Sequence, residues 1–348
     1  MQIISKLLPD GPLSPIGRSP KRQRMGRLMS VLLMVLCVFV LLVAGAVAVG
    51  GPADIRPLDS INAPFEKVDF SAVPPSQRFT ARDGTALAWL HYPATTVAAA
   101  QRRVVLVHGS SARAQSMHVL AQALAGAGFD VAALDMRGHG ESGTRGQAAY
   151  IGQLEDDVED FMHRVPFAGP STLLGFSSGG GFVLRFAGSA RQALFHRYLL
   201  LSPYLHHRAP TNRDTMGGNG ASWVSVGLPR MVGLSLLNAA GITRWNDLPV
   251  LRFALNEFSQ KLLTPTYSYT LATNFRPHDD YLRDIRQVQQ PLRIVAGLDD
   301  ELFDANGFAR VFAQAAQTVQ VTLVAGVNHI GLTLQPQAVA AVVKACGE

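Results

Sequence analysis

The chain has 348 residues, of which 48% are hydrophobic, enough for one large α/β domain with a tail or for two domains. The net charge is +6, but residues 1–27 hold six basic and one acidic side chain, about +5, which leaves about +1 for the other 321 residues. A near-neutral body argues against a nucleic-acid-binding protein, whose basic groups should line a folded face. Cys37 lies in an apolar run and Cys346 near the chain end, so no disulfide framework is expected.

Residues 28–49 form an uncharged run of 22 residues that predicts a transmembrane anchor. As a helix rising about 1.5 Å per residue it would span roughly 33 Å, against a hydrocarbon core of about 30 Å. The basic residues of the tail, residues 1–27, cluster directly before this apolar run. By the positive-inside rule this places the tail in the cytoplasm and the body outside it. The chain is therefore expected to cross the membrane once.

A cleaved signal peptide is the alternative explanation of the same run. Ala46-Val47-Ala48 offers small residues at which cleavage could occur, and cleavage would release a secreted protein. Signal peptides have an apolar core of only about 7–15 residues, so the longer run favours an uncleaved anchor.

Residues 50–76 are rich in proline and small residues and predict a linker. From residue 77 onward, short apolar runs alternate with helical patterns, which predicts a mostly parallel sheet with helices on both faces. The expected strands are 79–81 and 87–91, as a hairpin, and then 103–107, 131–134, 171–174, 198–201, 292–296 and 319–324, and the expected helices are 114–127, 154–165, 303–315 and 332–343, with one more directly after residue 177.

The alternation stops over residues 203–286, a stretch too long for a plain loop. It holds short helical pieces and a cluster of apolar residues between Trp223 and Leu234. We interpret it as a cap inserted between two parts of one core, residues 77–202 and residues 287–348.

The segment Gly175-Phe176-Ser177-Ser178-Gly179 follows an apolar run and opens into a helical pattern. A serine between two glycines at a strand–turn–helix junction is typical of a nucleophile elbow. A Cβ at either glycine would crowd such a strained turn. Ser177 is therefore the candidate nucleophile.

A serine hydroxyl needs a base, and the base needs a carboxylate that orients it. His329 lies in a glycine-flanked loop after the last expected strand. Asp300 follows strand 292–296, and the adjacent Asp299 is its competitor. The order Ser177, Asp300, His329 is the order expected of a nucleophile-elbow enzyme.

Backbone N–H groups of Ser178, at the start of a helix, and of Ser110, after strand 103–107, are the candidate donors for a developing oxyanion. His108 and His139 adjoin glycines and are expected to shape loops. No ligand cluster is spaced to complete a metal site with His206 and His207.

Four motifs stand in order along the chain: Val107-His108-Gly109-Ser110, Asp135 to Ser142, Gly175 to Gly179, and Gly297 to Asp300 with His329. Through these motifs the chain resembles the α/β-hydrolase superfamily over about residues 78–345. The segment from Asp135 to Ser142 is similar to the branch of monoacylglycerol lipases and lysophospholipases. The resemblance implies a serine hydrolase of carboxylic esters that needs no metal or cofactor. It also selects Asp300, three residues after Gly297, as the acid.

The apolar cap and the anchor predict a lipid-like ester, such as a lysophospholipid or a monoacylglycerol, as substrate. An aminopeptidase, a thioesterase or an acyltransferase on the same fold is the alternative, and an aminopeptidase would need cap carboxylates such as Glu257, Asp279 or Asp280 to hold an amine. The alternative that is not an enzyme is a tethered binding protein with a retired site, which the intact set of Ser177, Asp300 and His329 argues against.

Overall fold

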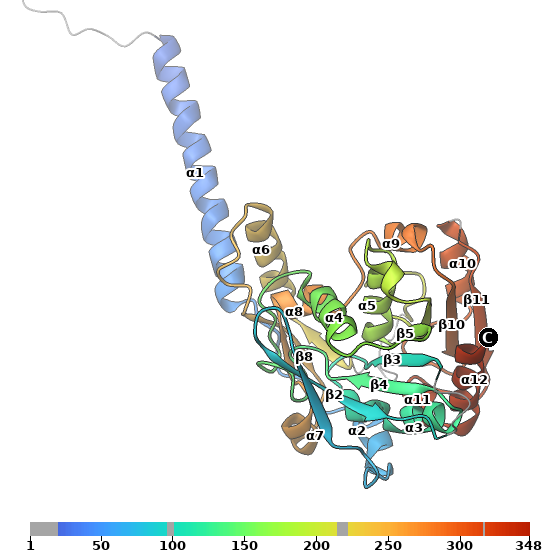
Figure 1. Cartoon of the computed structure of the whole chain (residues 1–348). Helices are drawn as coiled ribbons and strands as arrows, with labels where there is room; N and C mark the ends of the chain where they lie inside the picture. Colours follow the sequence, from blue (N-terminus) through green and yellow to red (C-terminus); the bar gives the residue numbers. More distant parts are fainter. Residues whose placement is uncertain (1–19, 96–100, 214–221, 316) are drawn as a thin grey trace, which may run out of the picture.

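The structure, a computed structural model, describes residues 20–95, 101–213, 222–315 and 317–348. Residues 1–19 of the expected basic tail and residues 214–221 of the expected cap lie outside the described residues. A long N-terminal helix leads into a body made of a large sheet, its covering helices and a smaller cap (Figure 1).

Eight strands form the large sheet, in the order β1-β2-β4-β3-β5-β6-β10-β11. β1 and β2 pair antiparallel, as do β2 and β4, and every other neighbouring pair is parallel. The mostly parallel α/β sheet predicted from the sequence is thereby confirmed. Its strands are β1 (Ser76–Thr80), β2 (Ala86–Tyr92), β3 (Arg103–Val107), β4 (Asp130–Leu134), β5 (Ser171–Phe176), β6 (Arg197–Leu201), β10 (Leu292–Gly297) and β11 (Gln320–Val324).

Each face of the sheet has its own hydrophobic core, because successive strand side chains point to opposite faces. In β3, Val105 and Val107 belong to one core, while Val104 and Leu106 belong to the other. The first core is completed by α4 (Gln153–Arg164), α5 (Ser178–Ala187), α9 (Tyr281–Gln287) and α10 (Gly307–Gln314), and the second by α3 (His118–Gly126), α11 (Gly331–Leu334) and α12 (Pro336–Gly347).

Some helices differ from the predicted bounds for local reasons. The expected helix 303–315 begins only at Gly307, because the Asp300 carboxylate accepts the N–H groups of Leu302 and Phe303 and holds that stretch in a turn. The expected helix 332–343 is divided into α11 and α12, since a proline at residue 336 forces the preceding residue into an extended conformation. The expected helix 114–127 starts with a short 3₁₀ turn, Ala114–Met117.

The cap contains a second, three-stranded antiparallel sheet in the order β7-β8-β9, which the sequence analysis missed. Strands of three to five residues are too short to show a clear alternation. The cap elements are β7 (Val224–Val226), α6 (Leu228–Ala239), β8 (Pro249–Phe253), α7 (Glu257–Leu262), β9 (Thr266–Ser268) and α8 (Tyr269–Asn274). α9, at the end of the expected cap, packs instead on α5 of the core.

The N-terminal helix α1 (Pro20–Val49) starts earlier than the apolar run. Within it, Arg27–Val49 is long and apolar enough to cross a membrane, by length and composition. Its C-terminal end packs on α6 of the cap, where Val47 is buried (Figure 1). Arg230 of α6 donates hydrogen bonds of 2.8 and 2.9 Å to the carbonyl oxygens of Val47 and Ala48.

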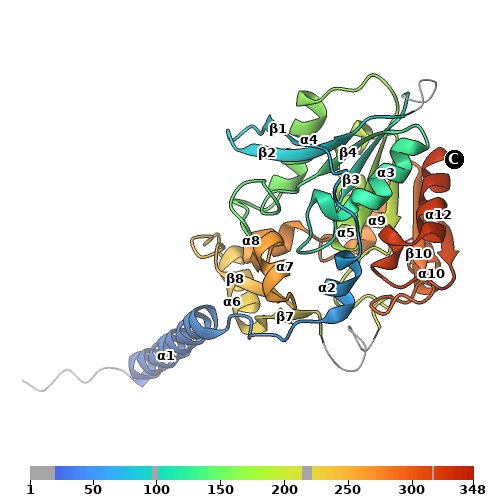
Figure 2. The same ribbon diagram turned by 90° about the horizontal axis from the view of Figure 1, so that it is seen from below.

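The expected linker, residues 50–76, contains helix α2 (Asp59–Glu66). Figure 2 shows α2 between β7 of the cap and the core helices. The part of the chain nearest to the long helix is thus built into the body.

Candidate active site

Ser177 lies at the sharp turn between β5 and α5, with φ 56° and ψ −121°. Positive φ at a residue other than glycine is strained, and it holds the side chain out above the sheet edge. A Cβ at Gly175 would lie 2.3 Å from the carbonyl oxygen of Gly179, and one at Gly179 would lie 2.2 Å from that of His108. Both glycines are therefore required by the close approach of backbone around the turn.

Three side chains from three strand ends are joined by hydrogen bonds. Nε2 of His329 lies 3.0 Å from the Ser177 hydroxyl, and Nδ1 of His329 lies 2.8 Å from Oδ2 of Asp300. All three residues are buried, at 3% exposure or less. His329 follows β11 and Asp300 follows β10, and these strands are parallel neighbours, so their loops lie side by side.

Asp300, and not Asp299, reaches His329. Asp299 is exposed, while the second carboxylate oxygen of Asp300 accepts the backbone N–H groups of Leu302 and Phe303 at 2.9 and 3.0 Å. Burial opposes ionisation of Asp300, but the charge and hydrogen bond of His329 outweigh it and lower the pKa of the carboxyl. The Asp300 carboxylate is therefore ionised near neutral pH.

Ser110 and Ser178 face each other beside Ser177, and their hydroxyl groups are in contact. Within the described part of the chain, neither backbone N–H has a hydrogen-bond acceptor. Ser178 also begins α5, whose dipole favours negative charge at this end. Ser111, which follows Ser110 in the chain, is held by the cap, because its N–H donates to the Tyr267 hydroxyl at 2.5 Å.

The two loop histidines are buried beside this region. Nδ1 of His108 donates to the carbonyl oxygen of Gly109 at 2.8 Å, and Nε2 accepts the N–H of Met136 at 3.2 Å. Burial lowers the pKa of His108 to about 4, so its ring is neutral at pH 7. His139 contacts the Tyr267 hydroxyl at 2.5 Å.

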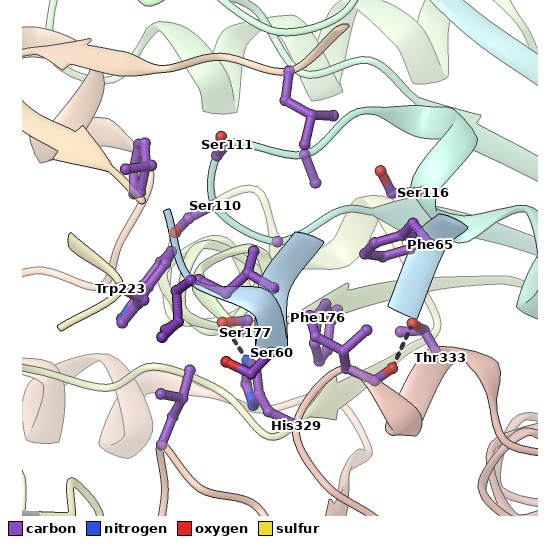
Figure 3. A pocket seen from close by; sticks show the side chains of 18 of the residues that line it. Ser60, Phe65, Ser110, Ser111, Ser116, Phe176, Ser177, Trp223, His329 and Thr333 are labelled. Carbon is purple, nitrogen blue, oxygen red and sulfur yellow. Dashed lines mark hydrogen bonds between the residues drawn. The ribbon is translucent and has the colours of Figure 1, made fainter. Parts of the chain in front are cut away.

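A pocket opens over Ser177 and His329, and most of its walls are apolar (Figure 3). Among the described residues, Glu301 is the one acidic side chain in its lining, and a carboxylate oxygen of Glu301 accepts the backbone N–H of His329 at 2.9 Å. The core supplies Met117, Phe176, Leu302 and Ile330, the cap supplies Trp223, Phe253, Leu255 and Leu263, and the α2 segment supplies Leu58, Ser60, Ile61 and Phe65.

The pocket walls were missed by the sequence analysis. Trp223 was noted only as one of a cluster of apolar cap residues, and Phe65 lies in a segment expected to be a linker. No motif marks such residues, because a wall needs only apolar side chains of suitable size. The three residues joined by hydrogen bonds, in contrast, each carry a recognisable local pattern.

Comparison with known proteins places the chain in a family. The Hydrolase_4 family, described as "Serine aminopeptidase, S33", matches residues 98–333. A monoacylglycerol lipase of Mycolicibacterium smegmatis is 41% identical over 105 residues, which are 28% of this chain and 36% of the lipase, so the match spans about a third of that relative. A non-heme chloroperoxidase of Kitasatospora aureofaciens is 24% identical over 68% of this chain and 87% of that protein.

Solved structures have the same fold. A soluble variant of monoglyceride lipase from Saccharomyces cerevisiae superposes with a TM-score of 0.60 at 18% identity, over 80% of this chain and 96% of that one. A bacterial membrane phospholipase A superposes with a TM-score of 0.55 at 15% identity, over 94% of this chain and 97% of that one. The chain belongs to the Hydrolase_4 family of serine hydrolases and has the α/β-hydrolase fold.

Proposed function

We propose that the protein is a membrane-anchored serine hydrolase that cleaves lipid-like carboxylic esters, such as a lysophospholipid or a monoacylglycerol. The observation that carries the proposal is the hydrogen-bonded chain of Ser177, His329 and Asp300 at the floor of an apolar pocket. Such a chain provides a nucleophile, a base and an orienting carboxylate.

In the first half of the reaction the acyl group of the substrate is transferred to Ser177 and the alcohol leaves. Nε2 of His329 takes the Ser177 proton as Oγ attacks the ester carbonyl carbon, and Asp300 stabilises the imidazolium that forms. The backbone N–H groups of Ser110 and Ser178 bind the oxyanion. The tetrahedral intermediate collapses, the C–O bond to the alcohol breaks, and His329 returns the proton to the leaving oxygen.

In the second half, water hydrolyses the acyl-enzyme. His329 takes a proton from water as its oxygen attacks the acyl carbon, and the same N–H groups hold the oxyanion. Collapse releases the carboxylic acid and returns the proton to Ser177.

The apolar lining supports a substrate with an acyl chain. Aliphatic and aromatic side chains from core, cap and α2 surround the space next to Ser177 (Figure 3). The names of the relatives, a monoacylglycerol lipase and a membrane phospholipase A, agree with this substrate class.

The contacts at the end of α1 support an anchor that is retained. Arg230 bonds to the carbonyl oxygens of Val47 and Ala48, the site where a signal peptide would be cut. Cleavage there would remove contacts that the cap makes with the helix end. The proposed topology has the N-terminus in the cytoplasm and the hydrolase body outside, following the basic tail before the apolar run.

An aminopeptidase, the activity in the family's description, is the competing function. The cap carboxylates considered for holding a substrate amine, Glu257, Asp279 and Asp280, are absent from the pocket lining that the described residues form. Glu301 is present, but it already accepts the His329 N–H. The lining thus favours an acyl chain over a charged amine.

The proposal is tested with the full chain in detergent micelles, offered p-nitrophenyl esters from acetyl to hexadecanoyl and amino-acid p-nitroanilides. We expect ester hydrolysis that rises with acyl length beyond butanoyl, little anilide hydrolysis, and no activity in the Ser177→Ala variant. Faster hydrolysis of anilides than of esters would replace the proposal with the aminopeptidase function. A profile without preference for longer chains would remove the lipid-like substrate.

A further inference from the structure

α2 presents one face to the pocket and the other to solvent. Leu58, Ile61 and Phe65 follow the spacing of one helix face, and all three line the pocket. Asp59 and Glu66 on the other side are exposed. α2 therefore forms part of the pocket wall, although it lies before the residues that match the hydrolase family, which begin at residue 98.

A buried asparagine of α2 holds this helix against the cap by hydrogen bonds. Asn62, 6% exposed, donates from Nδ2 to the carbonyl oxygens of Leu58 at 2.7 Å and Ala254 at 3.0 Å, and its Oδ1 accepts the N–H of Asn256 at 3.1 Å. The N–H of Leu58 also donates to the carbonyl oxygen of Ala254 at 3.0 Å. The donors and the acceptor of the Asn62 amide are thus engaged, which holds α2 in a defined position.

Phe65 is one of the aromatic side chains that line the pocket. In the view of Figure 3, Phe65, Ser116 and Thr333 are drawn on one side of Ser177 and Trp223 of the cap on the other, and all of them line the pocket. Phe176 lies between Ser177 and Phe65 in the same view. Phe65, Phe176 and Ser177 all line the same pocket, so two aromatic rings lie on the side of Ser177 away from Trp223 in this view.

We propose that α2 forms the distal wall of the acyl-chain site and that Phe65 sets the length of acyl chain the enzyme accepts, an inference that rests on the proposed ester hydrolase function. A linear acyl chain attached through its carbonyl carbon to Ser177 extends past Phe176 and ends against Phe65. Ile61 contacts the middle of the chain. Selectivity then resides in a segment that joins the membrane helix to the core.

The test compares variants by the ratio of kcat/KM for dodecanoyl and butanoyl p-nitrophenyl esters, measured on the full chain in detergent. A ratio is independent of the fraction of active protein. Phe65→Trp is expected to lower the ratio at least tenfold, because each methylene excluded from an apolar pocket costs about tenfold or more. Phe65→Ala is expected to move the preferred acyl chain to greater length.

Glu66→Ala is the matched control, since Glu66 is the exposed neighbour on the same helix. It is expected to leave the ratio as in the parent. Asn62→Ala removes the hydrogen bonds that hold α2 against the cap. It is expected to lower the ratio of kcat/KM for the dodecanoyl and butanoyl esters. Equal ratios in the parent and in both Phe65 variants would overturn the proposal while leaving the ester hydrolase function intact.

A second measurement does not depend on hydrolysis or on the folding of a Phe65 variant. The Ser177→Ala chain is irradiated with dodecanoic acid that carries a terminal diazirine, and the labelled peptides are identified by mass. Label on the peptide that contains Ile61 and Phe65 supports the acyl site at α2. Label confined to peptides of the cap overturns it. Absence of ester hydrolysis in the parent would refute the proposed function. The labelling would still show whether an acyl chain binds at α2, because it does not require hydrolysis.

Discussion

The carboxyl edge of the large sheet and the wall that faces it are built in different ways. At the edge, Ser177, Asp300 and His329 each follow a strand of the sheet by a few residues, so local turns place them. In the wall, α2 is held by bonds between residues far apart in the sequence, such as Asn62 and Ala254, which are 192 positions apart.

This difference in construction predicts two kinds of effect of a substitution, one on turnover and one on substrate selectivity. In the proposed mechanism, groups at the edge act on the reacting atoms, and their removal is expected to abolish turnover for every ester. Groups in the wall contact parts of the substrate that do not react, so their replacement is expected to change selectivity. The following experiments test this separation, from the largest expected effect to the smallest.

Ser177→Ala is expected to lower kcat for ester hydrolysis about 10⁴- to 10⁶-fold, because the nucleophile is lost. Ser178→Ala is the control, since it removes only a hydroxyl and keeps the backbone N–H that we propose binds the oxyanion. It is expected to retain kcat within a few-fold. Comparable losses in both variants, measured with butanoyl p-nitrophenyl ester, would contradict the assignment of the nucleophile.

Asp300→Asn is expected to reduce kcat about 10⁴-fold, because an amide favours the wrong tautomer of His329. Asp299→Asn alters the exposed neighbour and is expected to have kcat close to that of the parent. The measurement is kcat for one ester across the two variants and the parent. A larger loss in Asp299→Asn would exchange the roles of the two residues.

Acid is expected to destabilise the edge through His108. Its pKa is about 4 in the folded chain against an ordinary 6.5, so the unfolded chain binds the proton first as pH falls. Between pH 7 and pH 5 the free energy of unfolding should fall by about 2 kcal/mol from this group. Urea unfolding of the parent and of His108→Asn checks the effect, and an equal pH slope in the two chains would rule it out.

Arg230→Met is expected to loosen the joint between α1 and the cap by about 1 kcal/mol, because hydrogen bonds are lost while the alkyl packing is kept. Thermolysin cleavage within residues 50–58 should accelerate roughly fivefold. Arg244→Met, at an exposed arginine of the same cap, is the control. Equal cleavage rates in the two variants would show that the Arg230 bonds do not hold the joint.

The sequence predicted the mostly parallel sheet and the ranges of most of its strands, because each buried strand is a short apolar run between turn signals. The first expected strand, 79–81, lies instead at Ser76–Thr80, and the order of the strands in the sheet was not predicted. The proximity of Ser177 and His329 could be anticipated from the elbow and from a loop after a parallel strand. The residues alone left Asp299 as a competitor of Asp300, and the structure resolves their positions through the turn that the Asp300 carboxylate stabilises.

The wall could not be predicted for physical reasons. α2 contains Pro64, which indicates a break when the sequence is considered alone. Its helix is stabilised by the buried Asn62 and by packing of Phe65 against the core, which are tertiary contacts. The cap strands pair with each other across loops and are too short to show their period.

Labelling of the full chain in detergent with a fluorophosphonate, read by intact mass and peptide mapping, tests the central claim most directly. We expect a single adduct on Ser177 of the parent and none on Ser177→Ala, because only an activated serine reacts with this probe. An adduct on a different serine, or no adduct on a folded parent, would contradict the claim that Ser177 is the nucleophile of a working hydrolase.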